Sequence, residues 1–305
     1  MDTKVSTSRA AVRPADPVRA RPVIVGIDGS RAAIRAAEWA AAEAAARRVP
    51  LRLLAIVPAI DKPAFRPGGS RYRSASVALE NARRAVLAGS SDPADDPIEV
   101  GLEVRRGQPE QILVELSRSA GLIVLGSTDI GFFSHMVLGS TALTVTREAR
   151  CPVALIRPAA AVRGSVLVVV ADWASAKPAL AAAFRAADER DTDLIVARVW
   201  PGREWSGETE WVSMTPLVSD AQIRYCGRDF PAVEFRPVTV VGDVGTAIER
   251  FSAAAQLVVV THHIDALAPA HLERPTQDLV FHSSCPVLVL PDAPAEALAA
   301  EAVRP

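Results

Sequence analysis

The chain has 305 residues, of which half are apolar and 5% aromatic, and its formal net charge at pH 7 is −1. This length predicts one or two domains, each large enough to bury its own core. A net charge so close to zero provides no broad electrostatic field to attract nucleic acid or a membrane surface, so we expect neither as a partner. We expect a cytoplasmic globular protein. Residues 1–20 have the composition of a loose tail.

Apolar runs alternate with helical patterns along the first half. Strands are expected at Val23–Asp28, Leu53–Val57, Leu122–Leu125 and Val153–Ile156, with one more between the second and third helices. Helices are expected from a Ser30 cap to Arg47, from near Ser74 to Ala88, from Pro109 to near Gly121, and from Thr141 to Ala149. Strands that are apolar throughout and alternate with helices predict a parallel sheet covered on both faces.

The second half of the chain repeats the first. The run from Val23 to Asp28 matches the run from Val166 to Asp172, and Cys151-Pro152-Val153 matches Cys285-Pro286-Val287. The offset between matching positions falls from 144 at the two aspartates to 134 at the two cysteines, so the second copy has lost about ten residues, mostly after its second strand. We therefore predict a tandem duplication. The final strands of the two copies are the expected junction, because edge strands need cover.

Ligands bind parallel sheets beyond the carboxyl ends of the strands, where strand order reverses. Asp28, Ile56 and Gly126 all stand at such ends and are expected to converge. The stretch Gly126-Ser127-Thr128-Asp129 is followed, after nine residues, by Gly139-Ser140-Thr141 at a predicted helix start. A glycine loop leading to Gly-Ser at a helix N-terminus is a layout in which backbone N–H groups can hold phosphate.

Together these residues resemble the universal stress protein family in its tandem-domain form. The aspartate that ends the family's first strand corresponds to Asp28, and Gly126, Gly139 and Ser140 match three of the four positions of the signature G-x2-G-x9-G-[ST]. The resemblance runs from about Pro22 to Pro291. It implies an α/β fold of two tandem five-stranded parallel-sheet domains, Rossmann-like and of the adenine nucleotide alpha hydrolase-like class. We place the domains at residues 21–160 and 161–292, with tails at 1–20 and 293–305.

The resemblance also implies a site for ATP, with Mg²⁺ as its companion ion. Asp28, in one turn with Gly26 and Ser30, would lie beside the nucleoside, and the backbone of Ile56 would contact adenine. Leu125 and Gly126 would line the ribose, while Gly139, Ser140 and Thr141 would hold phosphates. Each position also has a structural alternative: Asp28 as a helix cap, Gly126 as a strand end, and Gly139-Ser140 as a turn and cap.

Asp129 departs from the family pattern, which has glycine at this position. Two like unit charges about 5 Å apart repel by roughly 3 kcal/mol at an effective dielectric near 20. A carboxylate facing a triphosphate would therefore cost about a hundredfold in affinity. Three outcomes stay open: Asp129 points to solvent, it meets phosphate through a divalent cation, or the site no longer binds ATP.

The second copy is more degenerate. Thr261 replaces the first signature glycine, and Glu273-Arg274-Pro275 stands where the first copy has Gly139-Ser140-Thr141. A glutamate adds repulsion and a proline removes an N–H donor, so we predict no ATP site there. Four of the five histidines lie in this region. We interpret them as loop and surface residues, with a metal or pH-sensing site as the alternative.

The leading functional prediction is a stress-response or signalling protein that binds adenine nucleotide through its first domain. The alternative is a scaffold that acts only through protein–protein contacts, and a weaker alternative is a slow ATPase or autophosphorylating protein. No spacing of Ser, His, Cys or Asp supports a catalytic or metal site, so we do not predict an enzyme. The tandem chain would mimic a dimer about a pseudo-twofold axis, and the family form leaves a further homodimer open.

Overall fold

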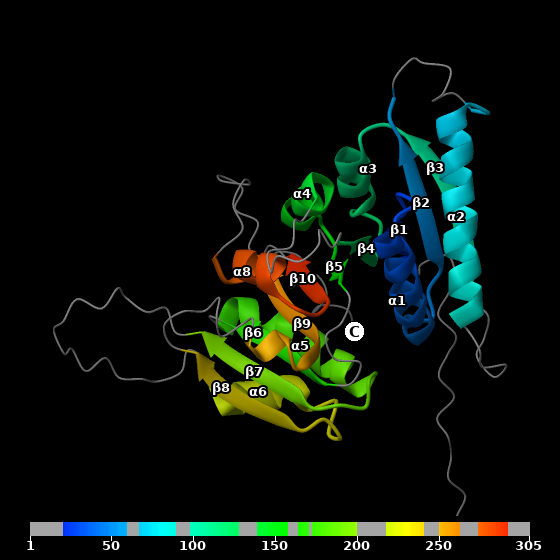
Figure 1. Ribbon diagram of the computed structural model, residues 1–305. Helices are drawn as coiled ribbons and strands as arrows, with labels where there is room; N and C mark the ends of the chain where they lie inside the picture. The colour runs from blue at the N-terminus through cyan, green and yellow to red at the C-terminus, as the bar shows by residue number, and fades with distance from the viewer. Residues whose placement is uncertain are drawn as a thin grey trace, which may run out of the picture.

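The computed structural model describes residues 21–59, 67–89, 98–127, 139–157, 164–170, 173–199, 218–240, 250–262 and 274–291 (Figure 1). The first half contains β1 (Val23–Gly26), α1 (Arg31–Arg47), β2 (Leu51–Val57), α2 (Ser70–Gly89), β3 (Val100–Arg106), α3 (Pro109–Leu116), β4 (Leu122–Gly126), α4 (Ser140–Glu148) and β5 (Val153–Ile156). The second contains β6 (Ser165–Val170), α5 (Trp173–Asp188), β7 (Leu194–Val199), α6 (Asp220–Gly227), β8 (Phe235–Val240), β9 (Ala255–His262), α8 (Arg274–His282) and β10 (Val287–Pro291). The predicted alternation of strands and helices is thus confirmed.

Two predicted helix bounds differ from the structure. α2 begins at Ser70 rather than near Ser74. α3 ends at Leu116 rather than near Gly121, because the N–H groups of Ser119 and Ala120 both donate to the Leu116 carbonyl at 3.0 Å and close the chain into turns. The start of α1 is as predicted, since the Ser30 hydroxyl accepts from the Ala33 N–H at 3.1 Å.

The two halves form one ten-stranded sheet in the order β3-β2-β1-β4-β5-β10-β9-β6-β7-β8. Strands within each half are parallel, and each half supplies five of them. The expected duplication appears as a palindromic strand order. The offset between copies is 143 from Leu51 to Leu194 and 135 from Val100 to Phe235, which places the main deletion between the second and third strands of the second copy.

The halves meet at β5 and β10, which pair antiparallel through Leu155–Val287, Ala154–Leu288 and Val153–Val289. This confirms the predicted junction and gives the arrangement that a pseudo-twofold axis through the pair would generate. Figure 1 shows β5 and β10 at the centre, with β3 and β8 at opposite ends of the molecule. Arg157, which follows β5 and is 2% exposed, donates to the carbonyls of Val280 and Ser283. A cation therefore caps the carboxyl end of α8 across the junction.

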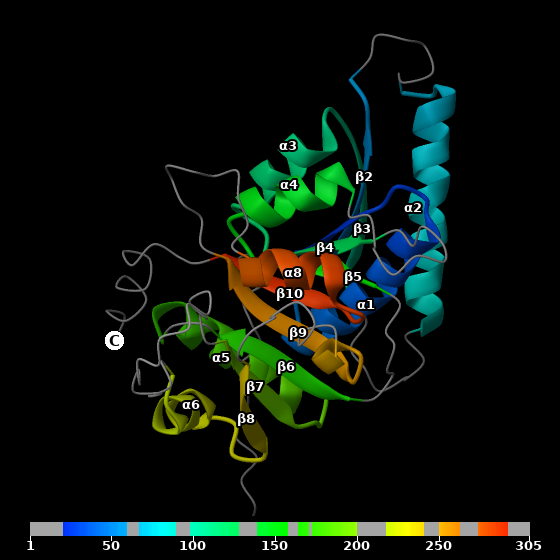
Figure 2. The same ribbon diagram turned by 60° about the vertical axis from the view of Figure 1, so that its left-hand side comes forward.

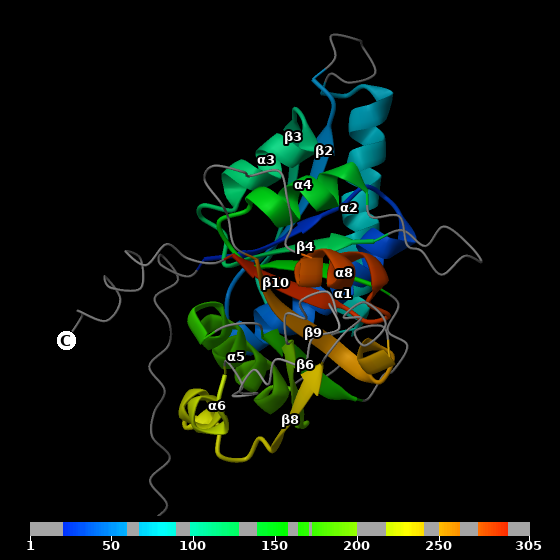
Figure 3. The same ribbon diagram turned by 90° about the vertical axis from the view of Figure 1, so that its left-hand side faces the viewer.

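Helices cover both faces of the sheet. α1, α2, α5 and α6 pack on one face, and α3, α4 and α8 pack on the other (Figure 2). On the second face, α8 lies over β10 and β9 (Figure 3). The central strands are buried along their length, as in β4, whose residues Leu122 to Leu125 are all buried. In the part of the chain that the structure describes, no helix is long and apolar enough to cross a membrane.

Candidate functional site

The carboxyl ends of β1, β2 and β4 meet the N-terminus of α4 around one pocket of about 280 Å³. This lies at the strand-order reversal between β1 and β4, where parallel sheets bind ligands. The pocket is lined by eight of the ten predicted binding residues, namely Gly26, Asp28, Ile56, Leu125, Gly126, Gly139, Ser140 and Thr141. The expected convergence of strand ends is therefore present in the fold, while the role of each residue toward a ligand stays a prediction.

Asp28 and Ser30 form the turn that joins β1 to α1. The Asp28 carboxylate accepts from the Ser30 N–H at 2.8 Å through Oδ1, and the Ser30 hydroxyl caps the helix. Gly29 between them has φ +87°, a conformation that favours glycine. The helix cap is thus the hydroxyl, while the exposed Asp28 carboxylate stays at the pocket wall. The alternative of Asp28 as the helix cap does not describe this turn.

Gly126 is required by the fold itself. A Cβ built on this residue would lie 2.4 Å from the carbonyl carbon and 2.5 Å from the carbonyl oxygen of Ala32. Any larger residue would push the end of β4 away from the first turn of α1. The close approach holds β4 and α1 together at the rim of the pocket, so this glycine has a structural reason that is independent of any ligand.

Gly139 has no such structural reason. Its φ of −61° and ψ of 150° suit any residue, and a Cβ built on it would meet nothing within 4 Å. It is the N-cap of α4 but offers no side-chain capping bond, and the first turn of α4 carries no acidic residue. The positive end of the helix dipole therefore opens toward the pocket without a neighbouring carboxylate in its first turn.

The apolar part of the pocket comes from Leu54, Ile56, Leu113 and Leu125. The sequence analysis missed Leu54 and Leu113 as lining residues. Leu54 lies two residues before Ile56 and therefore on the same face of its strand. Leu113 lies on the apolar face of the helix that starts at Pro109. Strand alternation and helix periodicity are the signals that would have found them.

A second, larger hollow of about 580 Å³ lies on the α2 side of the strand ends. Asp28 and Ile56 are the two predicted binding residues that line it. The glycines and hydroxyls that could meet an anion line the smaller pocket, so the candidate site is placed there. Asp129, together with the neighbouring loop, lies outside the described residues.

The universal stress protein family model matches this chain twice, over residues 19–157 and 163–291. The chain belongs to the universal stress protein family. Universal stress protein Rv2028c of Mycobacterium tuberculosis is 31% identical over 278 residues, covering 88% of this chain and 95% of that protein. Rv2624c of the same organism is 31% identical over 276 residues, covering 88% and 96%. The crystal structure of a universal stress protein from Archaeoglobus fulgidus superposes with a TM-score of 0.66 at 15% identity, covering 89% of this chain and 98% of that one, and shows the shared fold.

In the second universal stress protein domain, a hydrogen bond spans the equivalent place. Thr261 stands at the position of Gly126 and Thr276 at the position of Ala142. The buried Thr276 hydroxyl donates to the Thr261 carbonyl at 3.0 Å. The end of β9 is thereby tied to the first turn of α8, in the place where the first domain has pocket lining. Sequence analysis found Thr261 but missed Thr276.

His262 corrects one expectation for this domain. We expected loop and surface histidines, but His262 is the last residue of β9 and is 2% exposed. It pairs with Pro291 in the neighbouring strand β10. The side chains of the other three histidines of this region lie outside the described residues.

Proposed function

We propose that the first universal stress protein domain binds an adenine nucleotide in the 280 Å³ pocket, and that the protein acts as a nucleotide-dependent stress-response or signalling protein. The observation that carries the proposal is the convergence of Asp28, Ile56, Gly126 and the Gly139–Thr141 turn on one pocket. These residues are far apart in the sequence. Three different strand ends and one helix start supply them.

The α4 end of the pocket suits phosphate. The N–H groups of the first turn of a helix have no partner within that helix, and here Gly139 supplies no side-chain cap. The hydroxyls of Ser140 and Thr141 add further donors at the pocket wall. Gly139 would let a phosphate approach the backbone closely. Close approach of a phosphate would explain why position 139 is a glycine, although neither its φ angle nor its packing requires one.

The opposite end of the pocket suits a nucleoside. The Asp28 carboxylate accepts hydrogen bonds, and ribose hydroxyls are donors that match it. Leu54, Ile56, Leu113 and Leu125 offer an apolar surface on which a flat base can lie. The pocket therefore combines a carboxylate, an apolar wall and a helix N-terminus. These three features complement the ribose, the base and the phosphates of an adenine nucleotide.

The second domain is proposed to bind no nucleotide. The Thr276–Thr261 hydrogen bond ties together the two positions whose equivalents, Gly126 and Ala142, line the pocket of the first domain. Pro275 lies within the first turn of α8, where it supplies no N–H. We therefore expect one nucleotide per chain.

Thermal unfolding of the full chain with and without ATP and Mg²⁺ tests the proposal. A ligand at about a hundred times its Kd is expected to raise the midpoint by about 5 °C or more. Gly139→Glu, which copies Glu273 of the second domain, is expected to abolish the shift. Gly139→Ser, whose hydroxyl can cap the same N–H groups without adding a charge, is expected to reduce the shift but not to abolish it. A wild-type shift that survives Gly139→Glu would place the nucleotide elsewhere, and a protein without any shift would favour the scaffold alternative.

A further inference from the structure

The ten-stranded sheet ends in two strands that are equivalent by the duplication, β3 in the first domain and β8 in the second. Their registers establish the correspondence residue by residue. Leu51 pairs with Val100 as Leu194 pairs with Phe235. The N–H groups of Leu51 and Leu194 donate to the carbonyls of Glu99 and Glu234, both at 2.9 Å. By this register, Leu102 corresponds to Pro237.

The free edge of β3 presents backbone groups that no described strand pairs with. The Glu99 carbonyl and the Gly107 N–H both bond to β2, each at 2.9 Å. Because successive residues of a strand point their backbone groups to alternate sides, 101, 103 and 105 also face β2. The N–H and C=O groups of Val100, Leu102, Val104 and Arg106 therefore face outward. Such a row is a template for another strand.

The free edge of β8 is interrupted. The Glu234 carbonyl faces β7, so Phe235, Pro237 and Thr239 point their backbone groups outward. Pro237 has no N–H, and a proline on an edge prevents regular pairing. Its counterpart Leu102 keeps the donor and is 42% exposed. Of two equivalent edges, one is blocked and the other is open.

The open edge is complementary to itself. Glu103 and Arg105 lie on one face of β3 and form an ion pair at 2.6 Å. If two copies of β3 pair antiparallel about Val104, each Glu103 stands opposite Arg105 of the other copy, in a non-hydrogen-bonded pair whose side chains are close. Centring the pair on residue 103 would oppose two glutamates, and centring it on residue 105 would oppose two arginines. The charges therefore favour the Val104 register over these two.

Exposed apolar side chains gather at the same end of the sheet. Leu87 on α2 and Leu102 on β3 are two of the four large apolar side chains that stand exposed among the described residues, whereas Val77 on α2 lines the 580 Å³ hollow. α2 packs on β2 and β3, so Leu87 and Leu102 both belong to elements that border the open edge. A second copy joined along β3 brings its own α2 and β3 to this surface.

We propose that this end of the sheet is a homodimer interface, in which β3 of one chain pairs antiparallel with β3 of a second copy about Val104. The interface is isologous, because the same strand is used on both sides. The Pro237 edge stops further addition at the far end of each chain, so assembly closes at two copies instead of extending into fibres. The proposal is independent of nucleotide binding, since none of its residues lines the candidate pocket.

Sedimentation equilibrium of the full chain tests the proposal with one variant at each edge. The wild type is expected to be dimeric at about 100 μM, a concentration at which a micromolar interface is saturated. Leu102→Pro copies the residue that β8 already accommodates, and is expected to give folded monomers whose thermal midpoint no longer depends on protein concentration. Thr239→Pro removes an outward N–H from the β8 edge and is expected to leave the dimer intact. A monomeric wild type, or a dimer that survives Leu102→Pro, would overturn the proposal.

Charge exchange tests the register. Glu103→Arg places like charges opposite each other twice and is expected to weaken dimerisation about tenfold. The double variant Glu103→Arg with Arg105→Glu restores opposite charges both within and between chains, and is expected to recover wild-type dimerisation. If Glu103→Arg weakens dimerisation and the folded double variant does not recover it, pairing about Val104 would be contradicted.

Discussion

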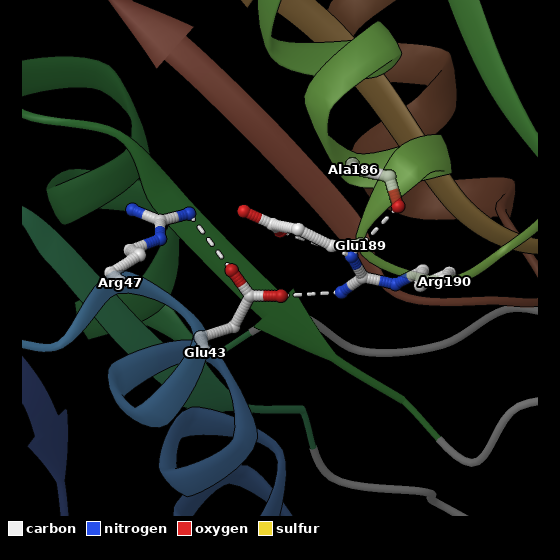
Figure 4. Close-up of polar contacts among 5 residues, drawn as sticks. All are labelled: Glu43, Arg47, Ala186, Glu189 and Arg190. Carbon is white, nitrogen blue, oxygen red and sulfur yellow. Dashed lines mark hydrogen bonds and ion pairs between the residues drawn. The ribbon is translucent and has the colours of Figure 1, made fainter. Parts of the chain in front are cut away.

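Glu43 on α1 and Arg190, just beyond α5, form an ion pair that joins the two domains on the sheet face covered by α1 and α5 (Figure 4). The Glu43 side chain is 7% exposed, and its other oxygen accepts from Arg47 at 2.8 Å. Arg190 also donates to the Ala186 carbonyl and lies 5.9 Å from the Trp39 ring. By the offset of 143, Arg190 corresponds to Arg47 and Ala186 to Glu43. One carboxylate therefore serves two arginines that the duplication made equivalent.

Removing that carboxylate is expected to destabilise the protein. Glu43→Ala leaves two guanidinium groups near the domain junction without their shared acceptor and is expected to cost about 2–3 kcal/mol. Glu80→Ala is the matched control, because Glu80 pairs with Arg83 on the surface and both side chains are nearly half exposed. It is expected to change stability by less than about 0.5 kcal/mol. Urea unfolding followed by circular dichroism measures both, and equal effects would refute the special role of Glu43.

Glu189 makes stability depend on pH. Burial, and then the nearby Glu43 carboxylate, raise the pKa of Glu189 above 4.5, against the opposing charges of Arg47, Arg190 and Arg185. The folded protein therefore binds this proton more tightly than the unfolded chain. The resulting stability is fully present below the ordinary carboxyl pKa and is lost as pH rises through the raised value.

Glu189→Gln removes this titration. We expect the variant to gain stability relative to the wild type as pH rises above 4.5, and to show a flatter pH profile of the thermal midpoint. The gain should vanish at lower pH, where Glu189 is protonated in both states. Parallel profiles for the two proteins across the whole range would show that Glu189 titrates normally.

The two glycines of the candidate site are expected to respond differently to substitution. Gly126→Ala forces a Cβ against the backbone of Ala32 and is expected to destabilise the protein by about 2–3 kcal/mol. Gly139→Ser places its Cβ in open space at a position where serine caps well, so the change is expected to stay within about 0.5 kcal/mol. Chemical unfolding of the two variants checks the contrast. Equal costs would mean that the fold, and not a ligand, requires Gly139.

The three cysteines are expected to differ in thiol reactivity. Burial raises the pKa of Cys151 to about 12 and of Cys285 to about 11. At about pH 8 these thiols hold almost no thiolate and are also covered by protein. Cys226 is partly exposed, and burial raises its pKa against the opposing charges of Lys177 and Arg228.

A disulfide reagent is therefore expected to modify one thiol per chain slowly in the folded protein, and all three after unfolding. Cys226→Ser is expected to leave the folded protein unreactive. Rapid modification of this variant would show that Cys151 or Cys285 is more accessible than the packed strands β5 and β10 allow.

The architecture could be predicted from the sequence because its central strands are buried on both faces. Such strands read as uninterrupted runs like Leu122–Leu125, and the second copy confirmed each run. The third strand of each copy lies at an edge and mixes charged with apolar residues, as in Glu103, Val104 and Arg105, so no apolar run located it. The turn at Ser30 was predictable because a cap depends on only a few neighbouring residues.

The contacts that the sequence did not predict depend on tertiary geometry. Glu43 and Arg190 are separated by 147 residues, and no local pattern links them. Thr276 and Thr261 are joined only because the start of α8 packs against the end of β9. His262 was interpreted as a loop residue because its neighbours are polar, although it is the last residue of the buried strand β9. In each case, the contact or the burial of the residue depends on tertiary packing, which the periodicity of the sequence does not reveal.

Asp129 is the position at which we expect a single substitution to change the proposed nucleotide affinity. Its carboxylate is expected to weaken ATP binding, so Asp129→Gly is expected to tighten it by up to about a hundredfold. Titration over a range of Mg²⁺ concentrations distinguishes the alternatives. A bridging cation would make the wild type more dependent on Mg²⁺ than the variant, and a side chain in solvent would give equal affinities.

Isothermal titration of the full chain with ATP and Mg²⁺ tests the central claim most directly. At a protein concentration of about 100 μM, we expect a stoichiometry of one nucleotide per chain in the wild type, weaker binding in Gly139→Ser and no binding in Gly139→Glu. Absence of binding heat in both the wild type and Asp129→Gly would contradict an adenine nucleotide site in the first domain.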